Sequence, residues 1–169
     1  MSAAPPVAIG YLDGRRLRRA LLAGIHRVVE ERGHLDRINV FPVADGDTGT
    51  NLSLTLSAVA DRLAVTEHRH AGELLATVAD AAVDGARGNS GAIFAQFFQG
   101  LAEELGELQR LDPGDLGRGL KAADRYARAA LAEPREGTVL TVMTAMAEAL
   151  SPADADFTAA IPRLLAAAR

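Results

Sequence analysis

The chain has 169 residues, of which 49% are hydrophobic and 24% charged, as expected of a globular domain large enough to bury a core. It contains no Cys, which excludes disulfides, thiolate chemistry and zinc sites built on thiolates, and agrees with a cytoplasmic location. The formal net charge of −4 argues against nucleic-acid binding, because acidic residues elsewhere balance the Arg-rich stretch 15–19.

The distribution of apolar residues also argues against membrane insertion. No apolar run approaches the roughly 20 residues that a spanning helix requires. Residues 1–9 are uncharged and contain prolines, unlike a signal peptide. Aromatic residues make up only 4% of the chain and Trp is absent, so Ala, Leu and Val must fill the core. Such small side chains allow close helix–helix approach, which favours a helical assembly.

Apolar residues recur at helical spacing along nearly the whole chain. Seven helices are predicted, in chain order, over residues 11–31, 48–63, 71–86, 90–105, 113–131, 138–150 and about 157–165. Residues 34–47 are expected to be irregular, and no strand is predicted. The pattern therefore predicts a single all-α domain over residues 1–169, an antiparallel helical bundle or barrel of about seven to eight helices.

The first segment that suggests chemistry is the loop 39–51, with the sequence NVFPVADGDTGTN. Asp45 and Asp47 lie two residues apart, and carboxylates on such a loop can converge on Mg²⁺, which prefers oxygen ligands. Hydroxyl and amide groups follow at the predicted helix start, where free N–H groups favour anions: Thr48, Thr50 and Asn51. The competing interpretation is a glycine-rich turn capped by Asp47 or Thr48.

An EF-hand is a further alternative for this loop, and the spacing excludes it. Counted from Asp45, position 6 is Thr50 instead of Gly, and position 12 is Leu56 instead of Glu.

Two more segments combine glycine with hydroxyl groups at a helix start. In residues 84–91, Asn89 and Ser90 precede a helix, although no Gly-Lys-Ser/Thr follows as in a P-loop. Residues 136–138 place Gly137 and Thr138 in the same way. Each segment alone also suits an ordinary capped turn. If all three helix starts lie at one end of the bundle, they form one pocket for anions.

Arginines and histidines add little further evidence for a site. Arg87 and Arg135 lie inside the candidate loops, where a guanidinium can neutralise charge that develops during phosphoryl transfer. Arg125 and Arg128 are expected to face solvent. The four histidines show no metal-ligand spacing, and the stretch 68–70 is expected to be solvated surface.

The three segments 39–51, 85–91 and 136–142 occur in an order that resembles a known family. They resemble the N-terminal domain of bacterial fatty acid kinase catalytic subunits, within the wider family of dihydroxyacetone kinase L-subunits. The likeness covers about residues 10–165. It implies an eight-helix antiparallel α-barrel that binds ATP or ADP and two Mg²⁺ at one mouth.

The resemblance also implies roles for individual residues. Asp45 and Asp47 would ligate magnesium, and the family's third ligand position falls near Asn39. Taken with the helix starts, the residues predicted to contact the nucleotide or its phosphates are Thr48, Gly49, Thr50, Asn51, Asn89, Ser90, Gly91, Gly137, Thr138 and Val139.

In this family the domain supplies ATP, while a separate carrier protein presents the acceptor. The acceptor would be a fatty acid carboxylate, giving an acyl phosphate, or a hydroxyl of the dihydroxyacetone type. Two alternatives stay open: a nucleotide-binding regulatory module without transfer activity, and a metal-dependent phosphohydrolase. The family continues with another helix and a Gly-rich turn, so a C-terminally truncated or shortened domain is expected. The oligomeric state stays open, with a homodimer among the alternatives.

Overall fold

The computed structural model describes residues 8–40, 44–150 and 154–168, which form eight α-helices and one two-stranded ribbon. The helices are α1 (Gly14–Glu30), α2 (Arg32–Ile38), α3 (Thr48–Val65), α4 (Ala71–Gly85), α5 (Gly88–Leu105), α6 (Pro113–Ala129), α7 (Val139–Ala149) and α8 (Phe157–Ala167). The strands are β1 (Leu12–Asp13) and β2 (Arg110–Leu111), which pair antiparallel. The predicted all-α class is confirmed.

Two sequence-based expectations were wrong. Residues 34–47 are not irregular throughout, because α2 occupies Arg32–Ile38, and a short ribbon exists where no strand was predicted. Helix α2 is only seven residues long, and its two apolar residues, Leu35 and Ile38, are too few for a periodic stripe; it packs on α3. The strands are two residues long, which is too short for an alternating pattern to show.

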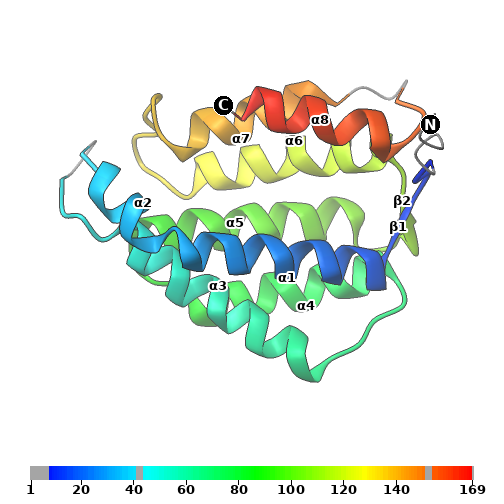
Figure 1. Ribbon diagram of the computed structural model, residues 1–169, viewed down its shortest axis with the longest axis horizontal. Helices are drawn as coiled ribbons and strands as arrows, with labels where there is room; N and C mark the ends of the chain where they lie inside the picture. Colours follow the sequence, from blue (N-terminus) through cyan, green and yellow to red (C-terminus); the bar gives the residue numbers. More distant parts are fainter. Residues whose placement is uncertain (1–7, 41–43, 151–153, 169) are drawn as a thin grey trace, which may run out of the picture.

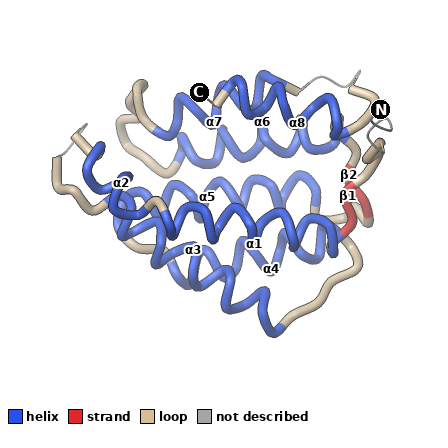
Figure 2. Tube along the Cα trace, viewed as in Figure 1, coloured by secondary structure: helices blue, strands red, loops and turns tan. Residues whose placement is uncertain are grey.

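The helices run back and forth along the long axis of the molecule (Figure 1). As a result α3, α5 and α7 all begin at the end of the bundle drawn on the left in Figure 1. The β1–β2 ribbon lies at the opposite end (Figure 2). The three helix starts therefore share one end of the bundle, which is the condition that a common anion pocket requires.

Small residues allow the closest helix contacts, as the composition predicted. The most extensive helix contact joins α5 to α6, where a Cβ on Gly100 would lie 2.7 Å from the Cα of Ala123. Larger side chains fill the space between helices, and each contributes roughly 1.5–3 kcal/mol when fully buried. Those that are almost completely inaccessible include Val59, Leu63, Leu74, Val78, Leu105, Leu140 and Phe157. Within the described ranges, every helix falls short of the length and apolarity that crossing a membrane requires.

Aspartate side chains cap three of the helices directly. Asp13 begins α1, Asp156 begins α8, and each accepts a hydrogen bond from a backbone N–H of its own first turn. Asp112 begins α6 in a capping box, and Pro113 follows in the first turn. Helices α3 and α5 begin differently, and both belong to the candidate site.

Candidate functional site

The first turn of α3 is capped by a carboxylate from another helix. Asp47 occupies the N-cap position, but its side chain makes no capping hydrogen bond. Asp36 on α2 accepts hydrogen bonds from the backbone N and the Oγ1 of Thr50, both at 2.9 Å. A turn capped by Asp47 or Thr48, the simpler interpretation of this loop, is therefore not what forms. The carboxylate of Asp47 is left free of a capping role.

Asp36 was missed by the sequence analysis because the helix that carries it was not predicted. The backbone N–H of Thr50 is the main cause that holds the pKa of Asp36 below its ordinary value, and the Thr50 hydroxyl lowers it further. An ionised Asp36 suits the positive end of the α3 dipole. Thr50 was predicted to contact phosphate, but both its hydroxyl and its backbone N–H donate hydrogen bonds to Asp36.

The carboxylates of Asp45 and Asp47 lie on an exposed turn next to α3. Gly46 between them has a φ of 65°, a left-handed conformation that glycine adopts without strain. The side-chain amide of Asn39 donates a hydrogen bond of 2.6 Å to Oδ1 of Asp45. Asn39 therefore orients a predicted ligand. Residues 41–43 of the motif lie outside the described residues.

These residues fit a magnesium ion that is completed by phosphate. Among residues 8–40, 44–150 and 154–168, no three His, Asp or Glu side chains gather as a metal site made wholly of protein ligands would need. Mg²⁺ typically takes one or two carboxylates and fills its other positions with water and substrate phosphates. Asp45 and Asp47 have the oxygen donors and the exposure for that kind of site.

Helix α5, the second candidate segment, begins without a side-chain cap. Arg87 is its N-cap residue, and its side chain makes no capping hydrogen bond. The N–H of Gly91 already donates to the carbonyl of Arg87 at 3.0 Å, so the free N–H groups of this helix precede Gly91. Asn89 is exposed and Ser90 is half-buried at this start. The arrangement offers backbone donors to an anion.

A buried threonine joins the start of α5 to α3. Thr55 is completely buried, donates to the carbonyl of Asn51 at 2.8 Å, and accepts from the N–H of Arg87 at 3.0 Å. Close by, Ser90 Oγ lies 3.5 Å from the carbonyl oxygen of Thr48. Two of the three predicted segments are therefore held side by side. Thr55 was missed, although a hydroxyl on the apolar side of a predicted helix is a usable signal.

Glycines at these two helix starts have packing reasons as well. A Cβ on Gly49 would collide with the carbonyl oxygen of Arg32 on α2, and one on Gly91 would collide with the hydroxyl of Thr55. Gly88, with a φ of 58°, leaves room for the side-chain amide of Asn51. Helix packing therefore accounts for Gly49 and Gly91, and their predicted contact with a nucleotide stays a prediction.

The third segment begins α7 at the same end of the bundle (Figure 1). Thr138 caps the helix, accepting from the N–H of Leu140 at 3.3 Å and donating to the carbonyl of Arg135 at 2.8 Å. Gly137 has a φ of 76° and open space around its Cα, and Val139 is half-buried against the core. In the described part of the chain, no hydrogen bond or ion pair joins this segment to the starts of α3 and α5.

Arg128 contradicts the expectation that it faces solvent. Its half-buried guanidinium donates to Glu136 at 2.7 Å, to Thr144 at 2.6 Å and to Asp124 at 3.3 Å. These contacts tie the loop before α7 to helix α6, and the hydrogen bond with Glu136 is the main cause that raises the pKa of Arg128. Arg125 on the same helix is exposed, as expected.

The two arginines predicted to assist transfer are exposed. The guanidinium of Arg87 donates to the neighbouring carbonyl of Ala86 at 2.8 Å, and that of Arg135 pairs with Glu133 at 3.1 Å. Both lie in loops at the end of the bundle where the three helices begin. Their roles in catalysis stay predictions.

Known proteins resemble the chain over most of its length. A family model described as the DAK2 domain matches residues 42–169. Protein YloV of Bacillus subtilis is 34% identical over 136 residues, which cover 80% of this chain and 25% of YloV. An uncharacterized protein of Staphylococcus saprophyticus is 33% identical over 141 residues, 83% of this chain and 26% of that protein. The chain thus spans about a quarter of the length of these relatives.

Proposed function

Since the chain belongs to the DAK2 domain family, that of dihydroxyacetone kinase-like proteins, we propose that it binds ATP with magnesium and supplies a phosphoryl group to an acceptor. One observation carries the proposal: Asp36 caps α3, which leaves the neighbouring Asp47 carboxylate free to act as a ligand. Within the described residues, Asp47 makes neither a capping bond nor an ion pair and lies two residues from the exposed Asp45, so its carboxylate oxygens are available to a metal ion.

Asp45 and Asp47 would hold magnesium, and the resemblance implies two such ions. Bound magnesium would neutralise charge on the phosphate oxygens. Asn39, through its hydrogen bond, would keep the Asp45 carboxylate in one orientation.

The starts of α3 and α5 would bind the phosphates. Thr55 holds the two starts together, so their donors are already in position before a nucleotide arrives. The N–H groups that precede Gly91 and the side chains of Asn89 and Ser90 would donate to phosphate oxygens. Thr48 and Asn51 would contribute from α3.

The segment 137–139 would lie beside the nucleotide, and Arg87 and Arg135 would neutralise charge that develops on the transferred group. In the transfer, an acceptor oxygen forms a new bond to the terminal phosphorus of ATP while the bond to the bridging oxygen breaks, and ADP leaves. We propose a carrier-bound fatty acid carboxylate as acceptor, which gives an acyl phosphate, with a dihydroxyacetone-like hydroxyl as the alternative.

Calorimetric titration with ADP, with and without Mg²⁺, tests the proposal. We expect ADP binding that depends on Mg²⁺ and that falls about tenfold or more in Asp45→Asn and in Asp47→Asn, because each variant removes one charged ligand. Asp61→Asn is the matched control, since it removes an exposed carboxylate from α3, the helix that follows the acidic turn.

Circular dichroism of each variant would establish that the fold is retained. ADP binding that is indifferent to Mg²⁺, or equal affinities in all three variants, would contradict the proposal. If ADP binds as expected, incubation with ATP and a fatty-acid-loaded carrier protein distinguishes three activities. Acyl phosphate indicates a kinase, inorganic phosphate without acceptor indicates a hydrolase, and unchanged ATP indicates a regulatory module.

A further inference from the structure

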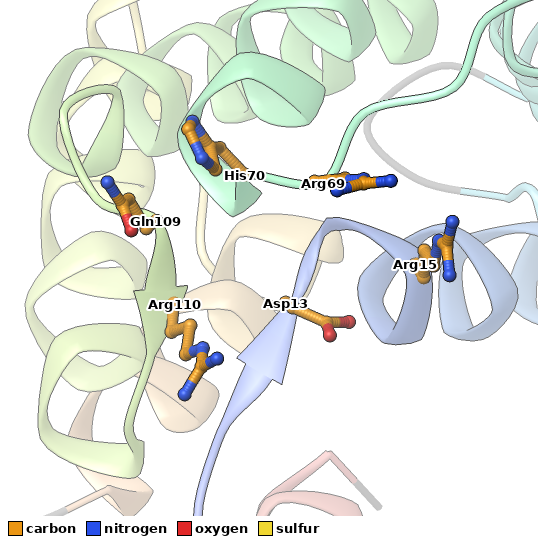
Figure 3. Close-up of a pocket in the computed structure, with 6 residues that line it drawn as sticks. All are labelled: Asp13, Arg15, Arg69, His70, Gln109 and Arg110. Atoms are coloured by element: carbon orange, nitrogen blue, oxygen red, sulfur yellow. The ribbon is translucent and has the colours of Figure 1, made fainter.

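A basic pocket lies at the end of the bundle opposite the candidate nucleotide site (Figure 3). It has a volume of about 440 Å³, within the range of small-molecule sites. The residues that line it come from the start of α1, the loop before α4 and the loop before α6: Asp13, Arg15, Arg69, His70, Gln109 and Arg110. The candidate nucleotide site uses none of them.

Backbone hydrogen bonds hold the three segments in a fixed relation. The N–H of Gly14 donates to the carbonyl of Arg69 at 2.9 Å, and the N–H of Ala71 donates to the carbonyl of Gln109 at 3.0 Å. The β1–β2 ribbon pairs Asp13 with Arg110. A Cβ on Gly14 would collide with the carbonyl oxygen of His68, so glycine is needed for this approach. The walls of the pocket are therefore organised before any ligand binds.

The arginines of the pocket are not neutralised by the protein. In the described part of the chain, Arg15 and Arg69 form no ion pair, and the guanidinium of Arg110 lies 4.4 Å from the centre of the Tyr11 ring. Among the lining residues the one carboxylate is that of Asp13, which already accepts from the N–H of Arg16 at 2.9 Å as the cap of α1, while the lining His70 lies 3.1 Å from the carboxylate of Glu73. The pocket lining thus carries three guanidinium groups and one carboxylate, and that carboxylate already serves as a helix cap.

Arrangement and chemistry together indicate the ligand class. Arg15 and Arg69 lie on one side of Asp13 in Figure 3, and Arg110 lies on the other side. Guanidinium groups bind phosphate and carboxylate oxygens through paired N–H donors. The side-chain amide of Gln109 adds a neutral donor. Groups spaced in this way suit a ligand with two or more anionic groups rather than a single small ion.

We propose that this pocket binds a small polyanion that carries phosphate or carboxylate groups, at a site separate from the one for ATP. The pocket is an open hollow with room for a small molecule, and the chain as a whole is acidic, which argues against a nucleic-acid surface.

The experiment is a titration of the ¹⁵N-labelled chain with pyrophosphate, and separately with citrate, followed by amide chemical shifts in EDTA. Without divalent cations, the candidate ATP site lacks its magnesium. We expect saturable shifts at residues 13–16, 68–70 and 109–110 with at least one of the two anions. The two titrations distinguish phosphate from carboxylate as the preferred group.

Arg69→Gln is the diagnostic variant, because Arg69 lines this pocket and not the second hollow beside it, which Arg15 lines as well. Its backbone carbonyl keeps the bond to Gly14, so the scaffold is retained. We expect the affinity to fall about five- to tenfold, as for one lost charge-assisted contact. Arg125→Gln removes the same charge from an exposed position on α6 and should leave the affinity unchanged.

Three results would overturn the proposal: no saturable shift with either anion, shifts confined to the starts of α3 and α5, or equal losses in Arg69→Gln and Arg125→Gln. The last result would indicate attraction by overall charge rather than a site. Because the titration omits both ADP and Mg²⁺, its failure leaves the proposed kinase function unaffected.

Discussion

At the scale of single residues, two different aspartates occupy the N-cap position of α3 and accept the capping hydrogen bond, although one residue commonly does both. Asp36 satisfies the first turn of α3 from a neighbouring helix, and Asp47, at the N-cap position, makes no capping bond. In an ordinary N-cap, the side chain of the N-cap residue, here Asp47, would accept the hydrogen bond from the first turn. Asp36 on α2 therefore stabilises the start of α3, and Asp47 is left for the proposed metal binding.

Asp36→Asn is predicted to destabilise the fold in a pH-dependent way. Because the pKa of Asp36 is lowered on folding, its ionised form stabilises the folded state. That contribution is complete above the unfolded-state pKa of about 4 and is lost as the pH falls through the lower folded-state pKa. Thermal melts at pH 7 should therefore show a lower Tm for the variant, and the difference should narrow below about pH 4.

Asp61→Asn serves as the control for this measurement, since Asp61 is exposed on α3. A difference between wild type and Asp36→Asn that stays constant from pH 7 to pH 3 would mean that the hydrogen bonds to Thr50 do not favour the charged carboxylate.

At the scale of elements, the candidate site depends on how helix starts are fixed to their neighbours. Thr55 ties the start of α5 to α3, and Arg128 ties the loop before α7 to α6. Neither hydrogen bond is local in sequence: Thr55 and Arg87 are 32 residues apart, and Arg128 and Glu136 are 8 residues apart. Each start is thus positioned by a side chain from an adjacent helix.

Gly88→Ala and Gly137→Ala form a matched pair. Both glycines have a positive φ, but a Cβ on Gly88 would collide with the side chain of Asn51, whereas Gly137 lies in open space. We expect Gly137→Ala to cost about 1 kcal/mol for the backbone conformation alone. Gly88→Ala should cost about 2–3 kcal/mol, because crowding is added. Urea denaturation measures both, and equal losses would show that Asn51 moves aside freely.

Arg128→Gln should destabilise the chain by about 1–2 kcal/mol, because Asp124 and Glu136 lose their charged donor. Arg125→Gln, an exposed substitution on the same helix, should change the free energy of unfolding by less than about 0.5 kcal/mol. Denaturant titrations of both variants test this. Similar small changes in both would mean that water replaces Arg128 at the loop.

At the scale of the whole molecule, the antiparallel arrangement separates two kinds of surface. The starts of α3, α5 and α7, with the acidic turn beside α3, lie at one end, and the arginines around the β1–β2 ribbon lie at the other (Figure 1). The proposed nucleotide site and the basic pocket are therefore separated by the length of the helices between them.

Ligand binding should stabilise the whole fold by mass action. At an ADP concentration about 100 times the dissociation constant, with Mg²⁺ present, the gain is roughly 2.7 kcal/mol. For a chain of this length that corresponds to a rise in Tm of roughly 5–10 °C. Differential scanning calorimetry tests the prediction, with EDTA in place of Mg²⁺ as control. An equal rise in EDTA would show that ADP binds without the acidic turn.

The periodicity of the sequence was sufficient for the all-α class and for seven of the eight helices. Stripes such as Leu52, Leu56, Val59 and Leu63 are long enough to favour helix over strand, and these four side chains are buried as the stripe requires. The Gly-hydroxyl segments before α3, α5 and α7 were also visible, because loop composition is local. Helix α2 was not, since a helix of seven residues with two apolar positions is too short to show a repeating stripe.

Tertiary structure alone decided which side chains the site can use. Capping of α3 by Asp36, the bond from Arg87 to Thr55 and the contacts of Arg128 all join residues that the sequence places apart. The same holds for the pocket at the other end, which Arg15, Arg69 and Arg110 line from three separate segments. Local patterns determine which segments become helices, because backbone hydrogen bonds and apolar stripes are local. Which polar groups are already paired, and which are free for a ligand, depends on neighbours that only packing supplies.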